Sequence, residues 1–347
     1  MRTTTLGRDG PVVGRLGLGA VGLSSHRCGP SPPERSEAVS LVQEAVDLGV
    51  NLVETAGAHA AGDSERLIGE AIRGRRDEVV LCTGGGLPGG ADGVLRPAGG
   101  PRALRAAVDD SLRRLHVDHI DLYLLRRVDP VVPLEESWGA LAEQVWAGKI
   151  RMLGLPAVTV AEARDAEAVH EAAAMAAEVS LFTRRALDDV VPYAVERRIA
   201  LLAGAPLGRG LLTGAPPGRA LPDGAQPGRL PPGAQPGHGL ADGALSRSGD
   251  LAPEDRRRTR PRFAPRAVRH DFALTRALAQ VASRHGATPA QVALAWLLRL
   301  GEHVVPLPGT TAPHHLAENL GGDRVRLTEQ DLTELEFLPG PAGAPEA

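Results

Sequence analysis

A carboxylate and an imidazole stand five residues apart in the stretch Asn51-Leu-Val-Glu-Thr-Ala-Gly-Ala-His59. Leu52 and Val53 predict a short buried strand, so Glu54 lies where that strand ends and the next loop begins. In a barrel of alternating strands and helices, this edge carries the catalytic groups. A histidine near a carboxylate can act as general acid or base around neutral pH. The stretch therefore predicts a site at Glu54 and His59.

Alternating strand and helix patterns provide the elements that must position this site. After an N-terminal hairpin (3–6 and 12–13), strands are predicted at 16–19, 51–54, 78–82, 120–124, 150–155, 174–178, 199–203 and 303–306. The helices predicted in the first half are 34–48, 64–73, 101–115 and 135–147. Eight such units favour an α/β fold of the closed (β/α)8 TIM barrel type over an open doubly wound sheet. No Gly-x-Gly-x-x-Gly follows the first strand, which argues against a Rossmann domain.

One segment interrupts this rhythm. Residues 215–250 are rich in proline and glycine and contain Gly-Ala-Gln-Pro-Gly twice. Such a composition has little to bury and predicts a flexible loop, with a lid over the site as the alternative. We expect a single barrel over 1–340 and a tail at 341–347.

Composition narrows the class of partner. The formal charge of -3 gives no basic footprint for nucleic acid, and no run of 18 apolar residues predicts a membrane span. The first residues lack the apolar stretch of a signal peptide, so we expect a cytoplasmic protein that acts on a small molecule.

Two cysteines, Cys28 and Cys82, cannot supply a four-ligand metal site, so none is predicted. Cys82 is expected to be a buried small hydrophobe rather than a nucleophile.

Several motifs together resemble the aldo-keto reductase family over nearly the whole chain. The matching segments are Leu16-Gly-Leu-Gly19, Ser111 to Leu122, Arg127-Val-Asp-Pro130, Gly148-Lys-Ile150, Pro206 to Gly214, Thr288 to Trp296, and Pro306-Leu-Pro-Gly-Thr310 with Glu318-Asn319. The resemblance implies a (β/α)8 barrel that binds NADPH across the carboxyl ends of its strands and reduces carbonyl groups.

The resemblance also implies four catalytic side chains, and each differs here. The family's aspartate has become Glu54, its tyrosine His59, its lysine Gly84 and its histidine Arg126. Because Lys149 is the only lysine and lies after a predicted helix, no lysine can take the missing place. Loss of a general acid alone costs ~10² to 10⁴ in rate, so ordinary carbonyl reduction is not expected.

The cofactor positions that the family resemblance implies fall into two groups. Polar and aromatic nicotinamide contacts are replaced by Pro156, Ala157, Ala176 and Val179. The expected cofactor-binding residues that remain are Pro206, Leu207, Gly208, Arg209 and Gly210 at the pyrophosphate, and Gly309, Thr310, Glu318 and Asn319 at the adenosine. Thr311 and Ala312 replace the basic residues that hold a 2′-phosphate. We therefore expect no required cofactor, with NADP or another adenine nucleotide binding weakly.

Three functions remain open. Glu54, His59 and Arg126 are expected to converge on one mouth, where they suit a redox-neutral dehydration, isomerisation or cyclisation of a small molecule, such as a secondary metabolite. The second is a residual NAD(P)H-dependent oxidoreductase. The third is a non-catalytic binding or regulatory scaffold, in which a Glu54–Arg126 salt bridge plugs the mouth.

Overall fold

Eight parallel strands form one curled sheet in the computed structural model, which describes residues 1–24, 33–89, 94–213, 257 and 260–336. The predicted loop at 215–250 lies outside these ranges. The strand order is β10-β9-β8-β7-β6-β5-β4-β3, each pairing in parallel with its neighbour in sequence. The strands are β3 (Leu18–Gly19), β4 (Leu52–Glu54), β5 (Val80–Gly85), β6 (Ile120–Leu125), β7 (Ile150–Pro156), β8 (Ala174–Glu178), β9 (Ala200–Gly204) and β10 (Val304–Pro306).

The two edges of the sheet meet at a seam between β3 and β10. The amide of Gly17 donates to Pro306 O over 3.1 Å, and the amide of Gly19 donates to Pro308 O over 3.2 Å. A side chain at Gly19 would place its Cβ 2.8 Å from Leu307 O, and one at Gly309 would lie 2.9 Å from Gly19 O. Only glycine allows this approach of two backbones. The (β/α)8 prediction is confirmed.

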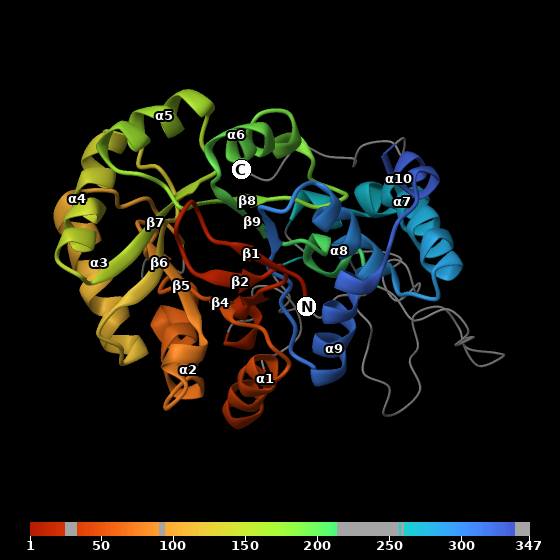
Figure 1. The fold of residues 1–347 in the computed structure, drawn as a ribbon, viewed down its shortest axis with the longest axis horizontal. Helices are drawn as coiled ribbons and strands as arrows, with labels where there is room; N and C mark the ends of the chain where they lie inside the picture. The colour runs from red at the N-terminus through yellow and green to blue at the C-terminus, as the bar shows by residue number, and fades with distance from the viewer. Residues whose placement is uncertain (25–32, 90–93, 214–256, 258–259, 337–347) are drawn as a thin grey trace.

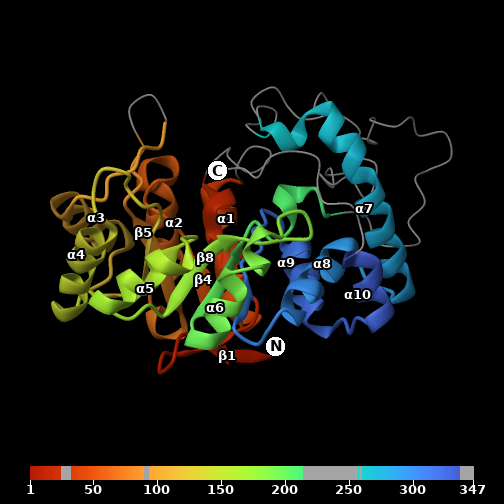
Figure 2. The same cartoon turned by 90° about the horizontal axis from the view of Figure 1, so that it is seen from above.

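Helices cover the outside of the sheet in chain order (Figure 1). They are α1 (Arg35–Asp47), α2 (Asp63–Ala71), α3 (Pro101–Leu115), α4 (Leu134–Trp146), α5 (Val160–Val169), α6 (Val190–Arg197), α7 (Pro265–Arg284), α8 (Pro289–Arg299), α9 (Pro313–Gly321) and α10 (Glu329–Glu336). Local signals set several helix starts: Thr159 with Glu162 and Thr288 with Gln291 form capping boxes at α5 and α8. Helix α10 lies beside α7 in both views (Figure 2).

Alternate residues of the strands point to opposite sides of the sheet. One set packs with the helices in the main core, whereas the other fills the barrel interior and includes Leu52, Val80, Cys82, Leu122, Leu124, Leu202 and Val305. An antiparallel hairpin of β1 (Thr3–Thr5) and β2 (Val12–Gly14) adds Leu6 and Val13 to this inner cluster. Figure 1 looks onto this hairpin, which covers one end of the barrel. The carboxyl ends of the strands, where the site is expected, lie at the other end.

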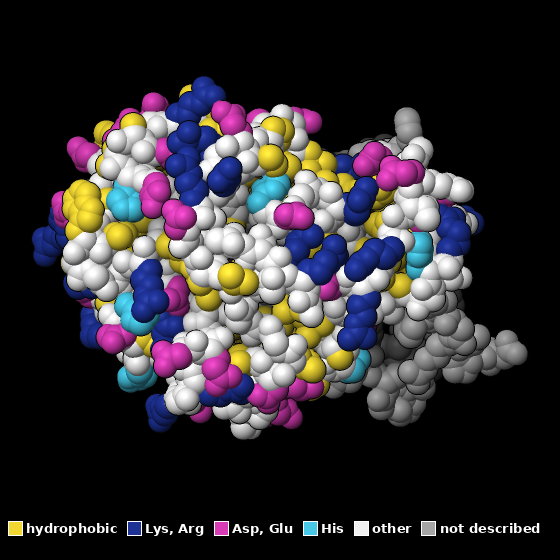
Figure 3. Space-filling model, viewed as in Figure 1, with side chains coloured by type: hydrophobic (Ala, Val, Ile, Leu, Met, Phe, Trp, Pro, Cys, Tyr) yellow, Lys and Arg dark blue, Asp and Glu magenta, His cyan; other side chains and the backbone are white. Residues whose placement is uncertain are grey.

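The outer surface carries charges of both signs. Figure 3 shows arginine and lysine side chains interspersed with aspartate and glutamate on the hairpin face, with hydrophobic side chains scattered among them. Within the described ranges, no helix has the length and apolar character that crossing a bilayer requires.

Candidate functional site

Glu54 and Arg126 form an ion pair at the carboxyl ends of β4 and β6. Glu54 is the last residue of β4, and Arg126 directly follows β6. Glu54 Oε1 lies 2.5 Å from Arg126 Nη2, and the same nitrogen donates to the backbone carbonyl of Thr55. On β4, Glu54 lies two residues after Leu52 and faces the barrel interior as Leu52 does. Arg126 lies two residues after Leu124 of β6 and faces inward in the same way, so both side chains enter the barrel. The structure therefore brings Glu54 and Arg126 together, as the sequence predicts.

The pair is largely removed from water. The side chains of Arg126 and Glu54 are 19% and 10% exposed. Burial has the largest single effect and would lower the pKa of Arg126, but the charge and hydrogen bond of Glu54 together with other neighbours outweigh it, so this pKa lies above its ordinary value. Arg126 Nε is buried without a hydrogen-bond partner, so the guanidinium keeps unused donor capacity. The site holds a permanent cation whose charge Glu54 balances.

Gly84 leaves the space that Arg126 occupies. It lies on β5 and pairs with Leu124 of β6. A Cβ at Gly84 would lie 2.8 Å from Arg126 Nε and would collide with the carbonyl oxygen of Leu124. A lysine at this position is therefore incompatible with the observed arrangement of Arg126.

Cys82 lies one inward position below Gly84 on β5, level with Glu54 on β4. Its side chain is fully buried in the inner cluster. Burial, assisted by the negative charge of Glu54, raises the pKa of the thiol well above its usual range. Cys82 is thus a neutral packing residue, as the sequence predicts.

His59 begins a short 3-10 helix, His59–Gly62, which connects β4 to α2. This backbone lies next to the carboxyl end of β4, but the His59 side chain lies outside the described part of the structure. Its role in the site stays a prediction. Arg127, the neighbour of Arg126, is exposed.

The pyrophosphate-type loop follows β9, at the same end of the barrel. Within it, Gly208 has φ +57°, and a Cβ there would lie 2.8 Å from the Phe182 ring, so glycine is required twice over. The amides of Gly208 and Gly210 donate to Ala205 O and Leu207 O, which engages them within the loop. In this conformation those two amides are used within the loop.

An ion pair anchors the same loop to β8. Arg209 Nη2 lies 2.7 Å from Glu178 Oε2 at the end of β8, and Arg257 donates to Arg209 O over 3.0 Å. Pro206 and Leu207 precede the short helix Gly208–Gly210. At the expected nicotinamide positions, Val179 is fully buried and Ala176 lies within β8, and these apolar side chains have no hydrogen-bonding group.

The adenosine-type residues lie around β10 and α9. Gly309 lies against the backbone of Gly19 at the barrel seam. Thr310 Oγ1 accepts a hydrogen bond from the Ala312 amide just before α9. Glu318 offers its backbone carbonyl to Gln291 over 3.0 Å, and Asn319 is buried at 4% exposure. Gly309, Thr310 and Glu318 therefore each make a contact within the protein.

One buried carboxylate near the site was not anticipated from the sequence. Glu65 on α2 is fully buried, and its two oxygens accept from Thr83 and Arg114. The only local signal is a carboxylate in the first turn of a helix, which reads as an ordinary helix-start charge. Among the described residues, no group of three histidine, cysteine or acidic side chains could hold a metal ion.

The fold and the polar mouth define a (β/α)8 barrel protein with its candidate site at the carboxyl ends of the strands. The Aldo/keto reductase family model matches residues 15–338, and the chain belongs to this family. It is 32% identical over 336 residues to a probable aldo-keto reductase 1 from Glycine max, covering 96% of this chain and 88% of that one.

Solved structures resemble it across almost the whole fold. A glycerol dehydrogenase from Gluconobacter oxydans matches with a TM-score of 0.77 and 23% identity, over 97% of this chain and 94% of that one. The thermostable aldo-keto reductase Tm1743, solved with the inhibitor epalrestat, matches with a TM-score of 0.71 and 24% identity, over 98% of this chain and 100% of that one. An aldo/keto reductase from Klebsiella pneumoniae, solved with NADP and acetate, matches with a TM-score of 0.70 and 22% identity, over 99% of this chain and 98% of that one.

Proposed function

We propose that this chain is a redox-neutral enzyme built on the aldo-keto reductase barrel. It binds a small molecule through a carbonyl oxygen or carboxylate at Arg126 and moves a proton rather than a hydride. The observation that carries the proposal is that the Arg126 side chain, although it pairs with Glu54 over 2.5 Å, remains 19% exposed at the mouth, so the pair does not close off the cation. Dehydration, isomerisation and cyclisation that pass through an enolate develop negative charge on an oxygen, which such a cation stabilises.

The absent lysine supports this assignment. The family's reduction depends on a lysine that lowers the pKa of a proton-donating tyrosine, and in this chain Arg126 fills the space beside Gly84. Proton transfer is assigned to His59, which follows β4 five residues after Glu54. Glu54 keeps Arg126 charged, and Arg126 holds the substrate oxygen.

Turnover of His59→Ala tests the proposal. With the substrate suggested by neighbouring genes and without added nucleotide, we expect kcat to fall by ~10² to 10⁴ while the melting temperature is retained. Arg126→Ala lowers turnover as well, because charge on the substrate oxygen is no longer stabilised. Arg127→Ala is the matched control, an exposed arginine at the next position, and leaves turnover unchanged. Unchanged turnover in His59→Ala would remove His59 from the mechanism.

A second candidate is an NAD(P)H-dependent oxidoreductase. The relatives bear reductase or dehydrogenase names, one was solved with NADP, and the loop 206–210 follows β9 at the site end of this barrel. Calorimetry with NADPH and the loss of NADPH absorbance with a generic aldehyde test it. Sub-micromolar affinity with steady consumption would replace the first proposal by the second. Binding of a small molecule without product from either assay would indicate a scaffold.

A further inference from the structure

The loop that carries His59 rests on one arginine. Gly57 precedes His59, and Gly62 ends its short helix with φ +86°. A Cβ at Gly57 would lie 2.6 Å from Arg114 Nη2, and one at Gly62 would lie 2.7 Å from Arg114 Nε. Both glycine backbones therefore touch the Arg114 side chain, on either side of His59.

Arg114 is itself held in place by a buried carboxylate. Its Nε lies 2.5 Å from Glu65 Oε2, and Glu65 is 0% exposed. Gly69 lies one turn after Glu65, and it lets α2 approach the backbone of Leu115 on α3 too closely for any side chain. This close helix contact brings Glu65 within reach of Arg114 across 49 residues of sequence.

The same start of α2 also fixes the strand ends around Arg126. Glu65 Oε1 accepts from Thr83 Oγ1 over 2.6 Å, and Thr83 directly precedes Gly84. Ser64 Oγ lies 2.7 Å from Thr55 Oγ1, and the Thr55 carbonyl accepts from Arg126. One cluster, made of Ser64, Glu65 and Arg114, thus contacts both the His59 loop and the supports of the ion pair.

We propose that Arg114, fixed by Glu65, is a positioning residue for His59. It sets the height of the loop 57–62 above the Glu54–Arg126 pair, and it acts through backbone contact rather than by touching substrate. The catalytic meaning of this arrangement rests on the proposed function, whereas the positioning itself does not.

NMR of the histidine side chains tests the positioning without any substrate. The His59 resonance is assigned by its disappearance in His59→Ala. We expect Arg114→Ala to move this resonance, because the loop loses the surface on which it packs. Arg105→Ala is the matched control, since Arg105 is also on α3 and pairs with an acidic residue, Glu143, on the neighbouring helix. A His59 resonance that responds no more to Arg114→Ala than to Arg105→Ala would overturn the proposal.

Gly57→Ala provides a second variant in case Arg114→Ala does not fold. It keeps both residues of the Arg114–Glu65 pair but places a methyl group 2.6 Å from Arg114 Nη2 and 3.1 Å from Glu65 Oε2, so the loop and the guanidinium must move apart. Gly57→Ala is expected to move the His59 resonance, because the loop must shift away from Arg114 to admit the methyl group. A His59 resonance that does not move in Gly57→Ala would show that the loop does not rest on Arg114.

Turnover separates this proposal from the proposed function. If His59 transfers protons, Gly57→Ala lowers kcat by up to ~10²-fold, as small misplacements of catalytic groups do. A resonance shift in a protein that turns over no substrate supports positioning and counts against the enzymatic proposal. Turnover that falls in His59→Ala but not in Gly57→Ala, with an unmoved resonance, supports the enzyme and overturns positioning.

Discussion

Glu54 helps to keep Arg126 ionised, and both side chains lie where they are poorly hydrated. Removing one partner leaves an uncompensated charge, so Glu54→Gln is expected to lower the free energy of unfolding by ~3 to 5 kcal/mol. Chemical denaturation measures this loss. Replacing both residues, as Glu54→Leu with Arg126→Met, recovers most of it, because no charge is then buried.

A matched exposed pair provides the control for this prediction. Arg105 and Glu143 are joined over 2.7 Å, but their side chains are 45% and 48% exposed. Glu143→Gln is expected to change the unfolding free energy by only ~0 to 1 kcal/mol. An equally small loss for Glu54→Gln would mean that water, not Arg126, solvates Glu54.

From the sequence, only those site residues could be predicted that lie at the carboxyl end of a recognisable strand. Glu54 ends a short apolar strand, and Arg126 follows another, so their shared edge was foreseeable. Arg114 was not, because a charged residue on a helix has the same sequence appearance whether it faces solvent or a loop. Its role depends on a contact with Glu65 made possible by Gly69, and nothing local encodes that contact.

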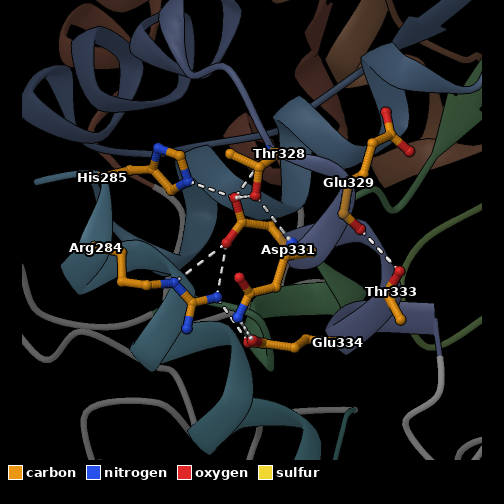
Figure 4. A network of polar contacts seen from close by, with 8 residues as sticks. Arg284, His285, Thr328, Glu329, Asp331, Thr333 and Glu334 are labelled. Carbon is orange, nitrogen blue, oxygen red and sulfur yellow. Dashed lines mark hydrogen bonds and ion pairs between the residues drawn. The ribbon is translucent and has the colours of Figure 1, made fainter.

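At the scale of elements, helix α10 is fastened to α7 through Asp331 (Figure 4). Its carboxylate is 3% exposed and accepts from Arg284 over 2.7 Å, from His285 over 2.8 Å and from the amide and hydroxyl of Thr328. Burial alone would raise the pKa of Asp331, but these hydrogen bonds lower it strongly. The ionised form is therefore the one that stabilises the folded chain.

This fastening makes part of the stability dependent on acid. Because the folded pKa of Asp331 is lowered, its contribution is present above the unfolded value of ~3.9 and is lost as pH falls through the folded value. Asp331→Asn is expected to cost ~1 to 3 kcal/mol at neutral pH, and the gap to the unmutated protein narrows below about pH 4. Thermal unfolding from pH 7 to pH 3 measures both effects.

Glu329→Gln is the control for Asp331. Glu329 lies in the same first turn of α10, but its side chain is 88% exposed and its ion pair with Arg299 is 3.3 Å long. We expect no change in stability beyond ~0.5 kcal/mol. A gap between Asp331→Asn and the unmutated protein that stays constant down to pH 3 would contradict the role given to the ionised carboxylate.

Most elements could be predicted because their signals are local. The predicted strands at 120–124 and 174–178 correspond to Ile120–Leu125 and Ala174–Glu178, since buried parallel strands appear as mostly apolar runs. Helix α3 has the predicted bounds, Pro101–Leu115, with proline at its start. Strand β5 runs on to Gly85 instead of ending at 82, because pairing with β6 carries Thr83 and two glycines into the sheet.

At the scale of the whole molecule, the barrel depends on the seam between β3 and β10. Gly309→Ala would put a methyl group 2.9 Å from Gly19 O, and two backbones must separate to admit it. We expect a loss of ~1 to 3 kcal/mol and faster hydrogen exchange at the amides of Gly17 and Gly19. Gly22→Ala, where a Cβ meets nothing within 4 Å, is the control. Unchanged exchange at Gly17 in Gly309→Ala would show that the seam tolerates the methyl group.

The position of this seam has a consequence for how the chain folds during its synthesis. Gly17 and Pro306 lie near opposite ends of the chain, yet they are hydrogen-bonded neighbours. Contacts between such distant residues form slowly, because a long loop must close before they contribute. On the ribosome, β3 therefore keeps an unpaired edge until β10 has been synthesised. An unpaired edge is a template for pairing with other strands, so the nascent chain is most prone to aggregate during that interval.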